Sequence, residues 1–140
     1  MKVTSYAVAR PAFYDRNATA SIISFRSTVA PHVSTVRCTK TIAAGTKAYM
    51  EGSTVIIQRV TGATVVGSAD AYFRLTSGSD TMSVSLGQKF DNTLTTYTVA
   101  TLLIPLTIYP GEVVDGLTSD ASTGGTLYFD MAAKFTVFTS

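Results

Sequence analysis

The chain offers few side chains that could carry out catalytic or metal chemistry. His32 is the only histidine and Cys38 is the only cysteine. A Ser–His–acid triad would have to use His32 as its base, but the sequence has no Gly-x-Ser-x-Gly segment to present a serine nucleophile. Zinc and redox sites need several soft ligands, which one thiol and one imidazole do not supply. We therefore expect His32 to be an exposed loop residue, and we expect no enzymatic activity and no cofactor.

Two acids near the C-terminal third are the best candidates for binding a cation. Asp115 and Asp120 lie in the most turn-rich part of the chain, residues 109–124, which we expect to form a loop at one end of the fold. Carboxylates and loop carbonyls are the hard oxygen ligands that calcium prefers. Their spacing fits no EF-hand, however, and acids in turns are commonly just solvated. A calcium site and a pair of solvated carboxylates both remain open.

Cys38 is expected to be structural. Alternation along residues 36–42 places Val36, Cys38 and Ile42 on one face of a strand. A free cysteine behaves as a small hydrophobic residue, so we predict a buried thiol.

Basic and aromatic residues alternate near the N-terminus. Arginines among exposed aromatics could bind nucleic acid, but the same residues could also anchor the chain on a neighbouring protein. The net charge of only +2 makes nucleic acid an unlikely partner. We identify as candidate subunit contacts Arg10, Phe13, Tyr14 and Arg16.

The overall composition is that of an all-β domain. Of 140 residues, 46% are hydrophobic and 14% are charged. This combination excludes a disordered chain, and the shortage of charge excludes a coiled coil. Threonine, serine and valine replace the charged residues, and β-branched side chains favour strands.

Short strands are expected between turn residues that recur about every ten positions. Pro110-Gly111 has the residues of a type II turn, and Asp115-Gly116 and Gly124-Gly125 are further reversal signals. The pattern predicts one compact domain, an antiparallel β-sandwich. The predicted strands cover residues 2–9, 21–28, 34–42, 47–59, 64–66, 69–76, 82–86, 97–104, 106–109, 126–131 and 134–138.

Three segments resemble a known group of proteins. They are IAAGTKAYME at 42–51, IYPGEVV at 108–114 and STGGTLYF at 122–129. Their order resembles small jelly-roll domains in the virion proteins of tailed bacteriophages, such as head-decoration and tail-associated subunits. The resemblance covers residues 42–138 and supplies no catalytic residues. It implies a jelly-roll sandwich over 42–140, with residues 1–41 forming an extended N-terminal arm or additional edge strands.

Charge is unevenly distributed along the chain. Residues 1–59 carry eight basic and two acidic side chains, whereas residues 60–140 carry three basic and seven acidic ones. Oppositely charged patches could steer copies of the chain together. Alternatively, the charges mix once the strands interleave.

Taken together, these features predict a structural subunit of a virus particle. We expect a homo-oligomer, a trimer or pentamer ring, that binds other virion proteins and is assembled after synthesis in the host cytoplasm. No signal peptide and no membrane-spanning stretch are evident, and no membrane partner is expected. The alternative is a carbohydrate- or receptor-binding module of a fibre or tail tip, with the seven tyrosines replacing the absent tryptophan as a sugar platform.

Overall fold

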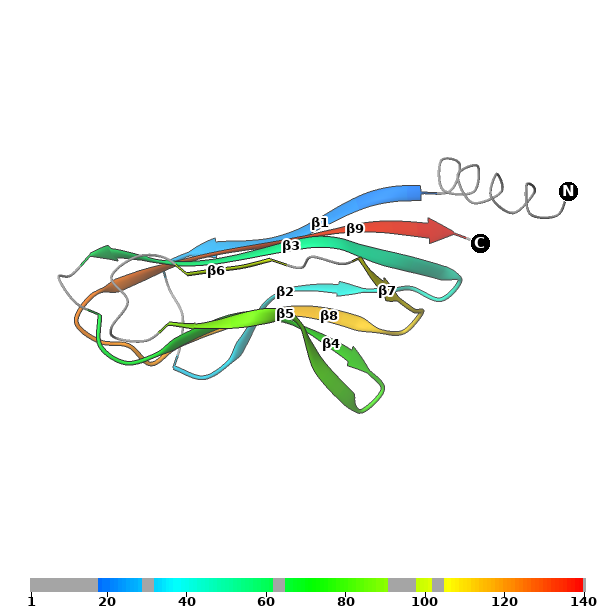
Figure 1. The fold of residues 1–140 in the computed structure, drawn as a ribbon. Helices are drawn as coiled ribbons and strands as arrows, with labels where there is room; N and C mark the ends of the chain where they lie inside the picture. The colour runs from blue at the N-terminus through cyan, green and yellow to red at the C-terminus, as the bar shows by residue number, and fades with distance from the viewer. Residues whose placement is uncertain (1–17, 29–31, 62–64, 91–97, 102–104, 140) are drawn as a thin grey trace, which may run out of the picture.

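The computed structural model describes residues 18–28, 32–61, 65–90, 98–101 and 105–139. The described residues form two antiparallel sheets and no helix, which confirms the predicted all-β sandwich (Figure 1). The strand expected at residues 2–9 and the four candidate contacts Arg10, Phe13, Tyr14 and Arg16 lie outside the described residues.

The first sheet, sheet A, is built around the last strand of the chain. β9 lies between β1 and β3, and β3 also pairs with β6 and, farther along, with β7. All of these pairings are antiparallel. The strands of sheet A are β1 (Ala18–Ser27), β3 (Thr46–Thr61), β6 (Thr98–Thr101), β7 (Leu106–Ile108) and β9 (Thr126–Thr139).

The second sheet, sheet B, has the order β2-β8-β4-β5, and its pairings are also antiparallel. Among the described strands, β1 and β6 lie at the two edges of sheet A, and β2 and β5 lie at the two edges of sheet B. The strands of sheet B are β2 (Thr35–Thr41), β4 (Ala69–Ser77), β5 (Asp80–Phe90) and β8 (Val113–Asp120).

The core lies between the two sheets and follows the two-residue period of the strands. Along β4, buried residues alternate with half-buried ones from Ala69 to Leu75, and β9 alternates in the same way from Leu127 to Phe135. Alternating side chains point to opposite faces of a strand, so one face of each strand enters the core. The largest core side chains are phenylalanines, with Phe73, Phe129 and Phe135 fully buried.

The predicted loop at 109–124 is wrong over half of its length. Residues Val113–Asp120 form β8, which is paired on both sides. The turn before it is as predicted: the Glu112 N–H donates to the Tyr109 carbonyl at 3.1 Å, and Gly111 has a φ of +84°. The Asp115-Gly116 pair is not a reversal, because Gly116 lies within β8 and is needed there for its small size.

Two further strand predictions differ from the structure. The strands expected at 126–131 and 134–138 are one continuous strand, because Ala132 and Ala133 keep the alternation of β9. The strand expected at 64–66 is reduced, within the described residues, to a single bridge between Val66 and Thr123.

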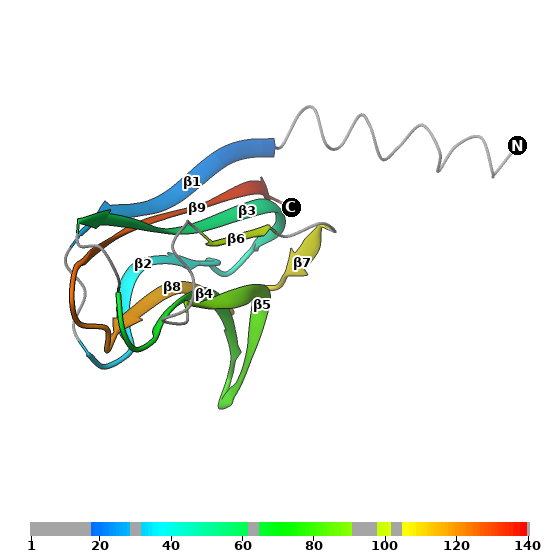
Figure 2. The same ribbon diagram turned by 60° about the vertical axis from the view of Figure 1, so that its left-hand side comes forward.

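The β4–β5 hairpin projects from the body of the sandwich in both ribbon views (Figures 1 and 2). Ser77 pairs with Asp80 around a two-residue turn in which Gly78 has a φ of +63°. Glycine adopts this backbone conformation without strain, and it is favoured at such tight hairpin turns.

Candidate functional site

The two candidate cation ligands are not brought together. Asp115 and Asp120 both lie on β8, five residues apart, so their side chains point to opposite faces of sheet B. Among the described residues no group of three histidine, cysteine, aspartate or glutamate side chains could hold a metal ion. Asp120 instead accepts hydrogen bonds from Ser122, one of them from its backbone N–H at 2.9 Å.

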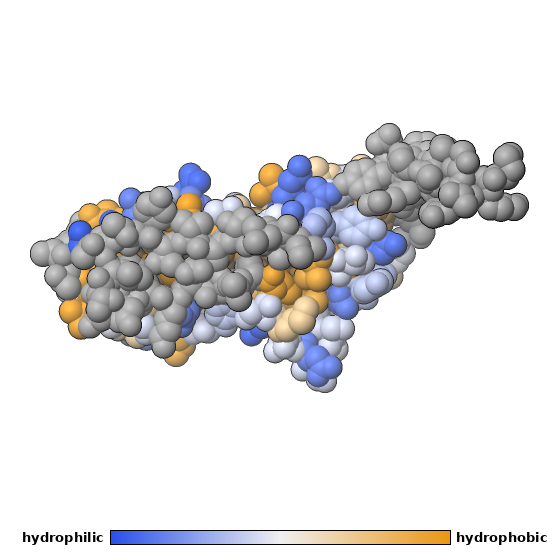
Figure 3. Space-filling view, in the orientation of Figure 1, coloured by the Kyte–Doolittle hydropathy of each residue, from blue (hydrophilic) through white to orange (hydrophobic). Residues whose placement is uncertain are grey.

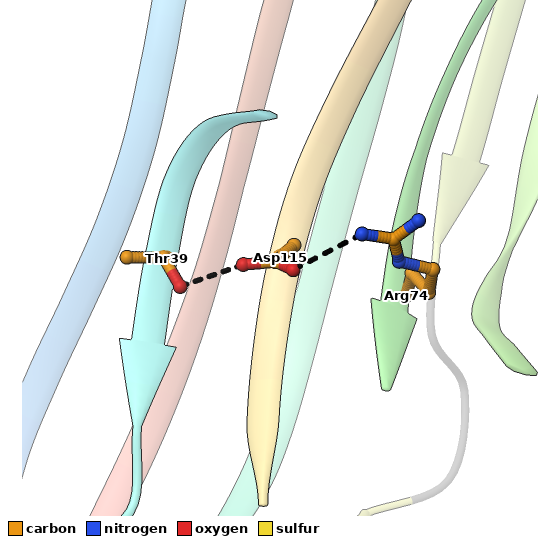
Figure 4. A network of polar contacts seen from close by, with 3 residues as sticks. All are labelled: Thr39, Arg74 and Asp115. Carbon is orange, nitrogen blue, oxygen red and sulfur yellow. Dashed lines mark hydrogen bonds and ion pairs between the residues drawn. The ribbon is translucent and has the colours of Figure 1, made fainter. Parts of the chain in front are cut away.

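Asp115 is the centre of a polar network on the outer face of sheet B. The Thr39 hydroxyl donates to Asp115 Oδ1 at 2.6 Å, and Arg74 Nη2 lies 3.3 Å from Oδ2. Figure 4 shows Asp115 on β8 reaching Thr39 on β2 in one direction and Arg74 on β4 in the other. The Asp115 side chain is 13% exposed, so the network ties three strands together at a largely desolvated carboxylate. Sequence reasoning missed this role because it placed Asp115 in a loop.

Cys38 packs against the core but is only half-buried. Burial raises the pKa of its thiol, and the negative charge of the nearby Asp115 carboxylate raises this pKa further. A backbone hydrogen bond with Gly116 partly lowers the pKa again. The expectation that Val36 shares its face is wrong. The register with β8 shifts between Val36 and Cys38, and Val36 is exposed. Cys38 is therefore a packing residue with little thiolate character, which does not suit it to nucleophilic chemistry.

His32 is exposed, as predicted, and lies in a bend between β1 and β2.

Two cationic side chains of β2 make contacts on the side of the sandwich where β1 and β2 lie. The Arg37 guanidinium lies 4.9 Å from the centre of the Phe25 ring, and its Nε donates to Thr118 Oγ1 at 2.9 Å. Lys40 Nζ donates to Ser21 Oγ at 2.9 Å, so both cations of β2 help to bind the two sheets together.

The sequence halves of opposite charge do not form separate faces. β9, from the acidic half, lies between β1 and β3 from the basic half, and Arg26 on β1 pairs with Asp130 on β9 at 3.0 Å. Over the described strands the charges are therefore mixed, as the second of the two interpretations expected.

The outer face of sheet A carries a shallow, mostly apolar hollow of about 250 Å³. Ile22 on β1 forms one wall and is 67% exposed. Small residues of β3 and β9 form the floor, and Lys134 stands beside it. The hollow is open and has one charged side chain, so it lacks the convergent polar groups of a specific ligand pocket.

Where Figure 3 leaves the described residues in view, hydrophobic side chains appear in separate patches among hydrophilic ones, and the projecting hairpin is mostly pale to hydrophilic. The hairpin does carry one exposed large hydrophobic side chain, Met82, which is 53% exposed. Within the described part of the chain, no helix has the length and apolar character needed to cross a membrane.

No protein-family model matches this chain, and no curated protein is found to be similar to it.

Proposed function

We propose that this protein is a non-enzymatic structural subunit of a virus particle, with a jelly-roll sandwich that assembles with copies of itself and with neighbouring virion proteins. The observation that carries the proposal is the order of the strands in the two sheets.

The order is simple when β6 and β7, which both pair with β3, are counted as one interrupted strand. The eight strands then pair first with last, second with second-last, third with third-last, and fourth with fifth. This pairing supports the proposed jelly roll, in which one long hairpin of strand pairs is rolled into two sheets. Jelly rolls are common in viral capsid proteins.

The composition supports an assembly role. A small domain that works alone usually keeps a surface rich in charge, whereas only 14% of this chain is charged. A surface of threonine, serine and alanine with scattered hydrophobic residues is suited to contact with other protein surfaces. Sheets that end in edge strands also benefit from oligomerisation, because a symmetric neighbour covers the edges.

The N-terminal segment supplies the proposed ring contact. It precedes β1, which begins at Ala18 at the end of the sandwich where β9 finishes. Arg10, Phe13, Tyr14 and Arg16 combine two cations with two aromatic rings, the side-chain types that most often dominate the energy of an interface. These four residues anchor each subunit to the next in a trimer or pentamer.

The ring contact is tested with a full-length variant in which Arg10, Phe13, Tyr14 and Arg16 are all replaced by serine. We expect light scattering to show that the variant loses the ring while its circular dichroism stays that of a β protein. A matched control, Lys2→Ser with Tyr6→Ser, changes one cation and one aromatic of the same segment and should keep the ring. If the four-residue variant has the same mass as the parent, the anchor assignment is wrong.

The wider proposal is tested on particles. Quantitative mass spectrometry of purified virus particles should find the chain in a fixed number of copies relative to the major shell protein. Absence from particles, with the chain present in the infected-cell lysate, would rule out a virion subunit.

The projecting β4–β5 hairpin favours a second candidate, a carbohydrate- or receptor-binding tip. Jelly rolls also occur in lectins, and a hairpin that stands clear of the body can reach a partner without moving the sandwich. A glycan array distinguishes the two functions. Reproducible binding that is lost on Met82→Asp would favour the tip, whereas a structural subunit should bind no glycan.

A further inference from the structure

The outer edge of β1 differs from every other sheet edge among the described strands. β1 ends sheet A and pairs with β9 on one side only. Ten consecutive pairs, from Ala18 with Phe138 to Ser27 with Phe129, run without a register shift. None of the described strands pairs with the opposite edge of β1, so from Ala18 to Arg26 that edge presents a regular row of backbone N–H and C=O groups, which is a template for another strand.

The other edge strands have features that discourage such pairing. β2 is only seven residues long, and its pairing with β8 shifts register between Val36 and Cys38. β5 shifts register twice against β4, and β6 is only four residues long. Bulges, charges and shortness are the usual means by which proteins protect an edge.

β1 has none of these features. Its sequence, ATASIISFRS, contains no proline, and its one charged residue, Arg26, pairs with Asp130 of the same chain. Its exposed large hydrophobic side chain, Ile22, lies near the middle of the strand. A long, regular edge with an exposed isoleucine, whose single charge is paired within its own sheet, is the pattern of an edge that is covered by a partner.

We propose that β1 pairs antiparallel with β1 of a second copy of this chain, about a two-fold axis that passes through the sheet beside Ile22. The inference rests on the proposed function for the premise that the protein assembles with itself, and it adds the contact surface. A two-fold axis perpendicular to the sheet brings the β1 edge of one copy against the β1 edge of the other. Both copies then use the same surface, which defines an isologous contact.

The face of each side chain fixes the register. Directly paired residues lie on the same face of a sheet, so outward-facing even-numbered residues must pair with even-numbered residues. Placing Ile22 opposite Ile22 of the second copy covers the exposed isoleucines and pairs Arg26 with Ala18. The two arginines then lie at opposite ends of the contact, about 27 Å apart along the strand.

Lys134 sets the electrostatics of this row. It pairs with Ile22 on the β9 side, so the row across the two-fold axis is lysine, isoleucine, isoleucine, lysine. The two isoleucines separate the lysines, and apart from Ile22 and Lys134 the residues that line the hollow are small. Replacing both isoleucines with lysine would place four cations side by side.

The proposed ring and the β1 contact predict different masses. With both contacts, the wild-type protein has twice the copy number of the ring. Loss of the β1 contact leaves a trimer or pentamer, whereas loss of the arm contact leaves a dimer. Failure of one proposal is therefore distinguishable from failure of the other.

The test uses the full-length chain with Ile22→Lys, measured by light scattering behind a sizing column. We expect the two-fold contact to weaken by at least about a hundredfold, because like charges placed directly opposite each other cost several kcal/mol. Met82→Lys, at a similarly exposed hydrophobic residue on the hairpin, is the matched control and should keep the wild-type mass. Thermal unfolding checks that both variants fold.

A charge-swap experiment tests the register. The Ile22→Lys variant should lose the two-fold contact, and an equimolar mixture with an Ile22→Glu variant should recover it with one of each chain, because a glutamate then faces the lysine at position 22. Native mass spectrometry detects the mixed species. An unchanged mass for Ile22→Lys, or a monomeric wild-type protein, would overturn the proposal, and failure of the mixture to recover the contact would overturn the register.

Discussion

Gly116 occupies a position where three strands converge on a space without room for a side chain. A Cβ atom there would lie 2.6 Å from Cys38 Sγ on β2, 3.0 Å from a ring carbon of Phe73 on β4 and 3.3 Å from the end of Met131 on β9. Contacts this short force neighbouring side chains to move within a packed core. The glycine therefore serves packing, although its sequence context resembles a turn.

Replacing Gly116 with alanine is expected to lower the free energy of unfolding by about 1–3 kcal/mol, because overpacking a core forces side chains from their preferred conformations. Urea unfolding measures the change. Gly52→Ala on β3 is the control, since nothing lies within 4 Å of its Cβ position. The double variant Gly116→Ala with Cys38→Ala should recover part of the loss, because it removes the closest contact. Equal costs at Gly116 and Gly52 would contradict this account.

Among the strands, β8 depends on side-chain contacts as well as backbone pairing. Asp115 joins β8 to both of its neighbours through Thr39 and Arg74, and its carboxylate is more buried than that of Asp130, which pairs with the exposed Arg26. The two aspartates are therefore a natural pair for comparing a buried polar junction with a surface ion pair.

Asp115→Ala is expected to reduce the free energy of unfolding by about 1–3 kcal/mol, because it leaves Thr39 and Arg74 without their shared acceptor. Asp130→Ala should cost at most about 1 kcal/mol, since exposed ion pairs contribute little. Denaturant titration of both variants measures the difference. A larger loss at Asp130 would show that the network does not hold sheet B together.

The sequence predicts a strand well where its residues have their usual structural roles, and poorly where turn-forming residues lie within a strand. The turn residues and the β-branched composition predict strands at 21–28, 34–42, 47–59 and 69–76, and these match β1, β2, β3 and β4 to within a few residues. β8 was missed because Asp115 and Gly116 are typical turn residues. In the fold, Asp115 bonds to side chains of β2 and β4, and Gly116 leaves room for side chains of the neighbouring strands. Neither role can be inferred from the sequence of β8 alone. The edge position of β1 could not be predicted either, because the alternation of residues along one strand does not show which strands lie beside it.

For the whole molecule, the two proposed contacts should respond differently to salt. The arm contact uses Arg10 and Arg16, and exposed charges are screened at high ionic strength. The β1 contact uses backbone hydrogen bonds and apolar side chains, which salt weakens little. Raising the salt from about 0.05 M to about 1 M, where the screening length falls to about 3 Å, should therefore convert the assembly toward dimers. Light scattering across the series measures this, and dissociation to trimers or pentamers instead would reverse the assignment of the contacts.

The central place of β9 in sheet A determines when that sheet can form. β1 and β3 leave the ribosome early, but their shared partner β9 begins only at Thr126, 65 residues after β3 ends at Thr61. During that interval both strands have unpaired edges, and pairings between distant parts of a chain form slowly. Nascent chains on one messenger could therefore meet through β1 before either has folded. The completion of β9 at the end of translation would then decide whether β1 first pairs with β9 of its own chain or with β1 of a neighbouring chain.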